Sequence, residues 1–226
     1  MTFPPLLCAE MAAAVYEWAG FVAFARGRGF LPPIVKFDNL NDQAAACVRD
    51  KAVLVVARGT EASRGVLDDI RQNFKTRPVR LGEGSVHRGY FDGAWALWPQ
   101  IANHLAHLAL PVTLTGHSMG GAIATVLAGL LQAEARHMQS GGPPVATQLV
   151  TFGSPMVGDA ELVAWLKVPH SRYVNGHDAA TLWPPVSAVR YGYCHHGARI
   201  RVDDGRWGFD HPAGRYVAAL RREAGP

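Results

Sequence analysis

The stretch that decides the fold is residues 112–136, VTLTGHSMGGAIATVLAGLLQAEAR. Residues 112–115 are typical of a short buried strand, and residues 119–136 predict a long apolar helix. Between them, Gly116-His117-Ser118-Met119-Gly120 matches the pattern Gly-x-Ser-x-Gly. At a strand-to-helix junction this pattern holds the serine in strained backbone geometry and lifts its hydroxyl above the sheet. We therefore expect Ser118 to be a nucleophile at the edge of a sheet.

The glycines around Ser118 support this interpretation. Neighbouring chain segments approach such a turn closely, and Gly116, Gly120 and Gly121 leave room for them. The start of the helix also directs N–H groups at the same point, which suits negative charge developing on an oxygen. The competing interpretation is a glycine-rich turn with an incidental serine, and the elements around the motif argue against it.

Outward from this stretch, short apolar runs alternate with longer helical patterns. The expected strands are residues 43–48, 52–57, 148–152, 172–175 and 198–202, and the expected helices are residues 91–110, 160–167 and 213–222. This alternation predicts a mainly parallel sheet with helices on both faces, which is an α/β architecture. Pro99 has no N–H to donate, so we expect the first of these helices to be interrupted or kinked there. We expect residues 1–226 to form a single domain.

A serine nucleophile needs a base that a third group orients. In chain order, the acid is expected after the serine and before the histidine. Two acids follow strands downstream of Ser118, namely Asp159 and Asp178. The acid commonly lies two strands beyond the serine, which favours Asp178. Asp159 precedes a helix and is expected to cap its N-terminus.

Three downstream histidines are candidates for the base. His195 and His196 precede the last expected strand, whereas His211 follows it. The base is expected after the final strand, which favours His211. His195 and His196 are neighbours on an extended segment and point to opposite faces, so they make a poor metal chelate and are expected to be structural. His117, inside the turn, is expected to pack beside the site.

Composition excludes several classes of protein. Hydrophobic residues are 49% of the 226 residues and charged residues 18%, which excludes a disordered chain. The net charge is +4 without a basic stripe, so we expect no nucleic-acid partner. Three scattered cysteines, Cys8, Cys47 and Cys194, favour reduced thiols over a disulfide framework. No Lys or Arg precedes Arg26, so the basic start of a signal peptide is missing. We expect a cytoplasmic location, with leaderless export as an open alternative.

Several motifs in the same order resemble the class 3 lipase family of α/β-hydrolases. The similarity extends over roughly residues 9–217. The segments that carry it are Arg58-Gly59-Thr60, Val86-His87-Arg88-Gly89-Tyr90, residues 116–122, Thr151-Phe152-Gly153-Ser154-Pro155, Val157-Gly158-Asp159, Val174-Asn175-Gly176-His177-Asp178, and Asp210-His211 ahead of Tyr216. The resemblance agrees with the choice of Asp178 and His211 made from the order of the strands.

The resemblance implies an α/β-hydrolase fold and a serine lipase or esterase that cleaves acylglycerol-type esters. In the implied mechanism, Ser118 attacks the ester carbonyl, His211 takes the serine proton and Asp178 orients the imidazole. The implied oxyanion hole uses the N–H of Met119 together with the N–H or hydroxyl of Thr60. No metal or organic cofactor is implied. The implied partners are an acyl ester or lipid substrate and transient contact with a lipid interface, and the oligomeric state stays open.

Other functions must be distinguished from the hydrolysis of acylglycerol-type esters. Related members cleave phospholipids or feruloyl-type aryl esters, so both are alternatives within the same chemistry. A non-catalytic lipase-like binding protein is an alternative of a different class, but such proteins usually lose a triad member. A dinucleotide-binding domain needs Gly-x-Gly-x-x-Gly after a strand, and the turn at Ser118 does not provide it.

The family carries its lid in the stretch that corresponds to residues 61–74. Here Val66, Leu67 and Ile70 fall at helical spacing, with Asp68 and Asp69 between them. This pattern predicts a short amphipathic lid, or else a surface helix packed on the body. Because a short, charged lid opens at little cost, we expect weak interfacial activation and a preference for short to medium acyl chains.

Overall fold

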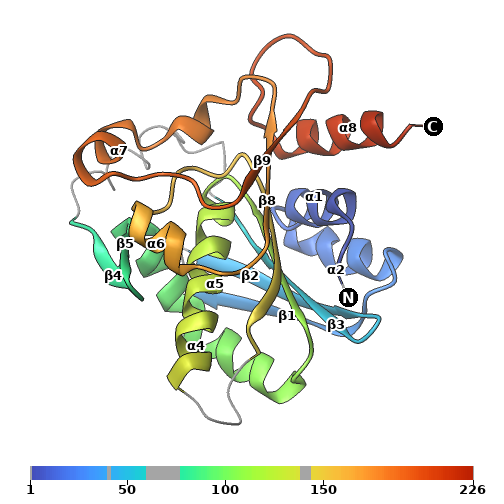
Figure 1. The fold of residues 1–226 in the computed structure, drawn as a ribbon. Coiled ribbons are helices and arrows are strands. Elements are labelled where there is room, and N and C mark those ends of the chain that lie inside the picture. Colours follow the sequence, from blue (N-terminus) through green and yellow to red (C-terminus); the bar gives the residue numbers. More distant parts are fainter. Residues whose placement is uncertain (1, 40–41, 60–76, 138–143, 226) are drawn as a thin grey trace.

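The structure, a computed structural model, describes residues 2–39, 42–59, 77–137 and 144–225 (Figure 1). Within these ranges, seven strands form one sheet in the order β1-β2-β3-β6-β7-β8-β9. They are β1 (Leu31–Asn39), β2 (Asp42–Arg49), β3 (Ala52–Ala57), β6 (Val112–His117), β7 (Ala146–Phe152), β8 (His170–Asn175) and β9 (Ala198–Val202). Neighbouring strands from β3 to β9 are parallel, whereas β2 is antiparallel to both β1 and β3. The prediction of a mainly parallel sheet is confirmed.

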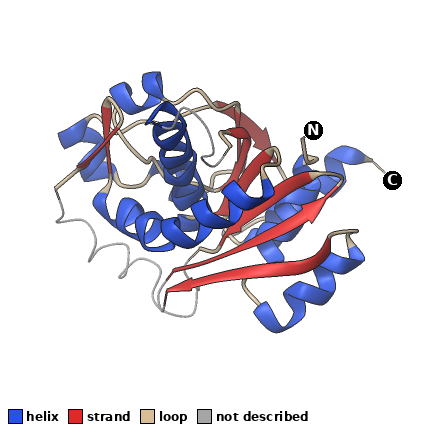
Figure 2. Ribbon diagram, turned by 90° about the horizontal axis from the view of Figure 1, so that it is seen from below, coloured by secondary structure: helices blue, strands red, loops and turns tan. Residues whose placement is uncertain are grey.

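Helices cover both faces of the sheet, as Figure 2 shows from below. One face carries α4 (Arg88–Leu108), α5 (Met119–His137) and α6 (Ala160–Trp165), and the other carries α1 (Pro5–Ala14), α2 (Trp18–Gly27) and α8 (Ala213–Ala224). On β3, Val53 and Val55 lie in the core with α4 and α5, whereas Leu54 and Val56 lie in the core with α1, α2 and α8. Successive strand residues point to opposite faces, so a strand covered on both sides must be apolar throughout.

The expected strands and helices are present, with shifts of a few residues at their ends. Of the interruption or kink expected at Pro99, the interruption is absent, because α4 continues through this residue. Leu97 and Ile101, on either side of Pro99, are fully buried in the same core. Their burial holds the helix together across the missing hydrogen bond, since tertiary packing supplies most helical stability in proteins.

Several short or irregular elements were not predicted. Besides α1, α2 and β1, they are the hairpin β4 (Val79–Leu81) and β5 (Gly84–Val86), the 3-10 helix η2 (Ala179–Leu182) and α7 (Pro185–Tyr191). β1 contains Pro32 and Pro33 and lies at the edge of the sheet, the place where strands tolerate proline. Among the residues that the structure describes, no helix is long and apolar enough to span a bilayer.

Candidate active site

The candidate site lies where β6 ends and α5 begins. Ser118, between them, has a φ of +57°, a left-handed conformation that residues with a side chain rarely adopt. The N–H of Ser118 donates to the carbonyl of Phe152 on β7 at 2.9 Å, and the N–H of Gly121 donates to the carbonyl of Ser118 at 2.9 Å. The predicted sharp turn is present, and it holds the serine at the carboxyl end of the sheet.

The glycines of this turn are required by close contacts. A Cβ on Gly116 would collide with the backbone of Gly120, and a Cβ on Gly120 would collide with the carbonyl oxygen of Ala57. A Cβ on Gly121 would lie 2.8 Å from Cβ of Ser154. The expectation that neighbouring segments approach the turn closely is confirmed, because both β3 and the segment after β7 touch it.

The structure brings Ser118, His211 and Asp178 together. Nε2 of His211 lies 2.8 Å from Oγ of Ser118, and Nδ1 lies 2.8 Å from Oδ2 of Asp178. Asp178 follows β8, and His211 lies between β9 and α8, as the strand order predicted. All three residues are buried. They form one continuous chain of hydrogen bonds from hydroxyl to carboxylate.

The partners of the imidazole determine where its proton lies. A carboxylate only accepts, so Nδ1 is the ring nitrogen that carries the proton in neutral His211. Nε2 then presents a lone pair to the hydroxyl of Ser118, which donates to it. In this arrangement His211 can take the proton of Ser118 as the oxygen attacks an electrophile.

Asp178 is held by two further donors. The hydroxyl of Tyr216 donates to Oδ2 at 2.6 Å, and the N–H of Ala180 donates to Oδ1 at 2.9 Å. Burial raises the pKa of Asp178, but the hydrogen bond and charge of His211, followed by these two donors, outweigh burial and hold the pKa below its ordinary value. The carboxylate is therefore ionised at neutral pH and able to stabilise a charged imidazole.

His117 supports the segment that carries His211. Its Nε2 lies 2.6 Å from the carbonyl oxygen of His211, so it must be the protonated nitrogen that donates there. Nδ1 then accepts from the hydroxyl of Tyr16 at 2.9 Å. Burial, followed by the nearby charge of His211, lowers the pKa of His117 to about 3. His117 thus remains neutral and acts as a packed hydrogen-bonding residue, the role expected for it.

Gly153, directly after β7, lies against the acid and the base. Its φ is +59°, and a Cβ there would lie 2.7 Å from Oδ2 of Asp178, 3.0 Å from the hydroxyl of Tyr216 and 3.1 Å from Nδ1 of His211. Atoms this close to a Cβ would have to move. A glycine at this position therefore leaves the space in which Asp178, His211 and Tyr216 meet.

Comparison with known families identifies the family of this chain. The sequence model of the family described as Lipase (class 3) matches residues 54–188, which is 135 of 226 residues. The chain belongs to the class 3 lipase family. The matched segment includes the serine turn, Gly153 and Asp178, while His211 lies beyond it.

Individual relatives agree with this assignment. A lipase of Rhizopus niveus is 31% identical over 168 residues, which cover 70% of this chain and 40% of the relative. Phospholipase A1-II 2 of Oryza sativa subsp. indica is 26% identical over 230 residues, covering 87% and 52%. The chain thus spans about half the length, or less, of these curated relatives. The solved structure of a Rhizomucor miehei lipase propeptide complex aligns with a TM-score of 0.67 at 21% identity, covering 87% of this chain and 67% of that one. This likeness shows that the fold is the α/β-hydrolase fold of fungal lipases.

Two further parts of the class 3 lipase prediction concern the segment after β3. Thr60, predicted for the oxyanion hole, and the predicted lid at residues 61–74 lie outside the described residues. Met119, the other predicted donor, is the first residue of α5 and directly follows Ser118. Its place at the start of a helix is one where backbone N–H groups suit developing negative charge.

The residues set aside by the sequence analysis have structural partners. Asp159 caps α6 by accepting from the N–H of Leu162 at 2.9 Å, as predicted, and it also accepts from the N–H of Ser85 at 2.9 Å. Nε2 of His195 contacts the carbonyl of Thr181 at 2.7 Å. Nε2 of His196 contacts the carbonyl of Leu166 at 3.1 Å. Among the described residues, no group of three or more His, Cys, Asp or Glu side chains could hold a metal ion.

Sequence reasoning missed the roles of Tyr216 and Gly153. From the sequence, Tyr216 is only a residue that follows the motif with His211, and Gly153 is only one residue of another motif. The sequence offers one signal for Tyr216: it lies five residues after His211, near the start of the last helix, which returns over the sheet. No local pattern shows that its hydroxyl reaches Asp178.

Proposed function

We propose that this protein is a serine carboxylester hydrolase that cleaves acylglycerol-type esters through an acyl-enzyme on Ser118. The observation that carries the proposal is the hydrogen-bonded chain Ser118–His211–Asp178, with 2.8 Å at both links, at the serine turn of a class 3 lipase. A serine activated by a histidine that an aspartate orients is the arrangement used for acyl transfer.

In the first half of the reaction, Oγ of Ser118 attacks the ester carbonyl while its proton passes to Nε2 of His211. The tetrahedral intermediate collapses, the bond to the alcohol oxygen breaks, and the departing alcohol takes the proton from Nε2. The acyl group is then an ester of Ser118. Asp178, held ionised by its donors, stabilises the imidazolium that exists between these two proton transfers.

In the second half, a water molecule gives its proton to Nε2 of His211 and attacks the acyl carbonyl. Collapse of this second tetrahedral intermediate returns the proton to Oγ of Ser118 and releases the carboxylic acid. The N–H of Met119 is assigned to the oxyanion of both intermediates, with Thr60 as its partner. A single oxyanion donor is worth about 10²–10³-fold in kcat, so this assignment carries much of the rate.

Exposed apolar side chains around the site favour a substrate presented at a lipid surface. Five of the eight large hydrophobic residues exposed in the described ranges lie on two segments, η2–α7 and the connection from β9 to α8. They are Leu182, Val186, Val189, Trp207 and Phe209. Figure 1 shows α7 and this connection at the same end of the molecule, above the start of α5. An aromatic ring that costs free energy in water is stabilised at a membrane interface.

Phospholipids are the second candidate substrate class. The observation that favours them is the similarity to a protein named phospholipase A1, which covers 87% of this chain. Both substrate classes present an acyl ester to the same three residues, so they differ in the group that leaves. A comparison of triacylglycerol, diacylglycerol and phosphatidylcholine emulsions separates them.

The decisive experiment combines labelling with one substitution. We expect an organophosphonate to modify Ser118 alone, and we expect Ser118→Ala to lower kcat on a chromogenic ester by about 10⁴-fold or more. Ser171→Ala, on β8, is the matched control and should leave kcat unchanged. Ordinary turnover by Ser118→Ala would overturn the nucleophile. An unlabelled, inactive native protein would instead support a lipase-like binding protein.

A further inference from the structure

The segment that carries His211 has no regular secondary structure of its own. Residues 203–212 connect β9 to α8, and they must hold the imidazole within 2.8 Å of both Ser118 and Asp178. Loops of this length are usually mobile unless side chains hold them. Contacts other than the two hydrogen bonds of the imidazole must therefore hold the segment around His211 in place.

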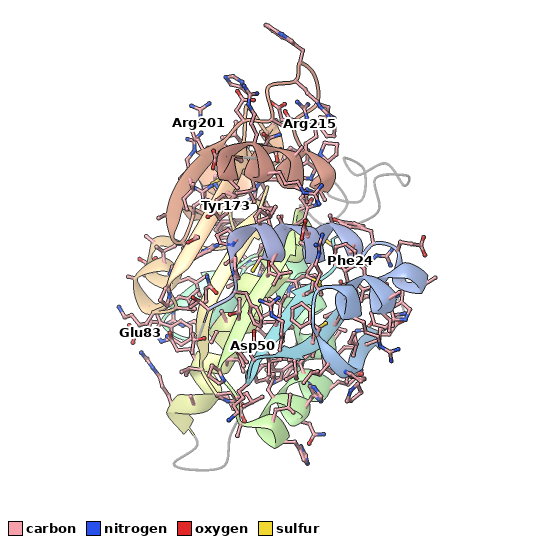
Figure 3. All side chains as sticks on the ribbon, turned by 90° about the vertical axis from the view of Figure 1, so that its right-hand side faces the viewer. Phe24, Asp50, Glu83, Tyr173, Arg201 and Arg215 are labelled. Atoms are coloured by element: carbon pink, nitrogen blue, oxygen red, sulfur yellow. The ribbon has the colours of Figure 1, made fainter. Side chains whose placement is uncertain are left out.

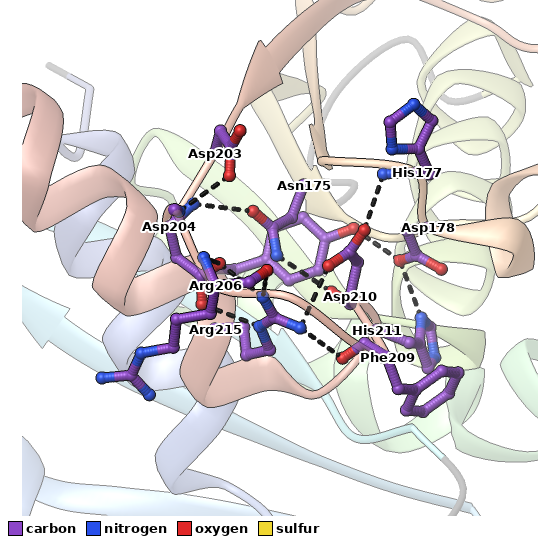
Figure 4. Close-up of polar contacts among 12 residues, drawn as sticks. Asn175, His177, Asp178, Asp203, Asp204, Arg206, Phe209, Asp210, His211 and Arg215 are labelled. Carbon is purple, nitrogen blue, oxygen red and sulfur yellow. Dashed lines mark hydrogen bonds and ion pairs between the residues drawn. The ribbon is translucent and has the colours of Figure 1, made fainter.

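Arg215, in the first turn of α8, supplies many contacts to this segment (Figure 4). Its Nε and Nη2 donate to the two carboxylate oxygens of Asp204 at 2.7 and 2.6 Å. Nη2 also donates to the carbonyl of Arg206 at 2.6 Å, and Nη1 donates to the carbonyl of Phe209 at 2.8 Å. Nη1 completes the set with an ion pair to Asp210 at 3.0 Å. Four hydrogen bonds and one ion pair thus connect a single guanidinium to four residues of the segment.

Asp210 links this segment to the one that carries the acid. One carboxylate oxygen, Oδ1, pairs with Arg215, and the other, Oδ2, accepts from the N–H of His177 at 2.8 Å. Asp210 directly precedes His211, and His177 directly precedes Asp178. The carboxylate of Asp210 therefore joins the backbone beside the base to the backbone beside the acid.

Asn175, the last residue of β8, makes a second link of the same kind. Its Nδ2 donates to the carbonyl of Asp210 at 3.1 Å, and its Oδ1 accepts from the N–H of Asp204 at 3.3 Å. We call Asn175, Asp204, Asp210 and Arg215 the Arg215 network. It lies at the carboxyl end of the strands, where Figure 3 shows Arg215 at the end of the molecule away from Asp50 in the β2–β3 turn.

The Arg215 network lies close to the surface, but its central ion pair is largely covered by neighbouring side chains and backbone. The side chain of Arg215 is 13% exposed and that of Asp204 only 1%. The hydrogen bond from Arg215 holds the pKa of Asp204 below its ordinary value, so the pair stays charged at neutral pH. Bidentate arginine–carboxylate pairs in such settings fix geometry as well as contributing free energy.

We propose that Arg215 and Asp210 are positioning residues for the hydrolase proposed above. They contact none of the reacting atoms, but they set the separation between the backbone that carries His211 and the backbone that carries Asp178. This inference rests on the proposed function, because the separation matters only if His211 and Asp178 act together. A shift of about 1 Å in a catalytic group can cost about 10²-fold in rate.

The test compares four variants on a water-soluble chromogenic ester. We expect Arg215→Ala to lower kcat by about 10–100-fold with KM within about twofold of the native value. Arg215→Lys keeps the charge without the planar fork, so its kcat should fall between those of Arg215→Ala and the native protein. Asp210→Asn leaves one acceptor oxygen for the two donors Arg215 and His177, so one of these contacts is lost and kcat should fall about tenfold. Arg221→Ala is the matched control, since Arg221 lies on the same helix and pairs with Glu10 at 2.6 Å.

A second readout separates positioning from mere loss of stability. The proton on Nδ1 of His211 gives a low-field NMR signal when it is hydrogen-bonded to a carboxylate. We expect this signal to be broadened or lost in Arg215→Ala and retained in Arg221→Ala. If Arg215→Ala does not fold, Asp210→Asn decides, because it keeps the bidentate contact between Arg215 and Asp204.

The possible outcomes are distinct. Native kcat and an unchanged low-field signal in Arg215→Ala and Asp210→Asn would overturn the inference while the native protein is still labelled at Ser118. Equal losses in Arg221→Ala would also overturn it, since they would show general destabilisation of α8. A native protein without esterase activity or labelling would overturn the proposed function, and the inference with it.

Discussion

Replacing Gly153 by alanine adds one methyl group at the point where acid and base meet. The new Cβ would lie 2.7 Å from Oδ2 of Asp178 and 3.1 Å from Nδ1 of His211. Contacts under 3.0 Å are essentially absent for real Cβ atoms, so the carboxylate must shift by several tenths of an ångström. Gly153 directly follows β7, and its N–H donates to the carbonyl of Tyr173 on β8 at 3.1 Å, so we expect the side chain of Asp178 to be the group that moves.

The expected magnitude has two separate parts. A left-handed φ costs alanine roughly 1–2 kcal/mol, and alanine recovers about 0.4–1 kcal/mol by restricting the unfolded chain. We therefore expect the backbone strain by itself to lower the free energy of unfolding by about 1 kcal/mol. The displaced carboxylate adds a loss of about 10–100-fold in kcat, since about 1 Å of misplacement costs about 10²-fold.

Gly192→Ala isolates the first part from the second. Gly192 has a φ of +67°, close to the +59° of Gly153, but nothing lies within 4 Å of a Cβ there. Urea unfolding and steady-state kinetics on a soluble ester should be measured for both variants. We expect a larger loss of stability in Gly153→Ala, because overpacking adds to the backbone strain, and a loss of kcat in Gly153→Ala alone. A Gly153→Ala protein with the kcat of Gly192→Ala would refute the steric reasoning.

Four other substitutions test the remaining parts of the site. Asp178→Asn should lower kcat by about 10⁴-fold, because it favours the wrong tautomer of His211. Asp159→Asn should cost at most about 1 kcal/mol of stability and leave kcat unchanged. The reverse result in steady-state kinetics would show that Asp159 is the catalytic acid. Tyr216→Phe removes a donor to a carboxylate and should lower the free energy of unfolding by about 1.5–3 kcal/mol at neutral pH. Because the pKa of Asp178 is lowered in the folded state, this stabilisation is present above the ordinary aspartate pKa and is lost as the pH falls through the folded one, so the deficit measured in urea should shrink in acid. The pKa of His117 is lowered to about 3 in the folded protein, so on acidification the unfolded chain takes up this proton first. The free energy of unfolding should therefore fall by up to about 1.4 kcal/mol per pH unit between pH 6.5 and 3. In urea unfolding measured across this pH range, His117→Phe should show a shallower fall than the native protein, and equal slopes for the two would contradict the assignment.

Local pattern and chain order were enough to predict the architecture and three side chains of the site. The strand-to-helix junction at Ser118 is encoded within a few residues, because glycines and a sharp turn are needed there whatever surrounds them. In a parallel sheet, carboxyl ends of successive strands meet at one edge, so the order of strands placed Asp178 and His211 near Ser118. Local sequence allowed an interruption of α4 at Pro99, but the helix continues there because its buried residues pack in the core on both sides of the proline.

Tertiary structure alone decided which groups support those three side chains. Tyr216 reaches Asp178 across 38 residues, and His117 reaches the carbonyl of His211 across 94. Arg215 holds the segment around His211 through partners that share no sequence pattern. Such contacts depend on how α8 and the connection from β9 pack on the sheet, to within a fraction of an ångström. Hydrophobic periodicity predicts which face of its own helix or strand a side chain lies on. A hydrogen bond between distant elements depends instead on where the two elements are placed relative to each other.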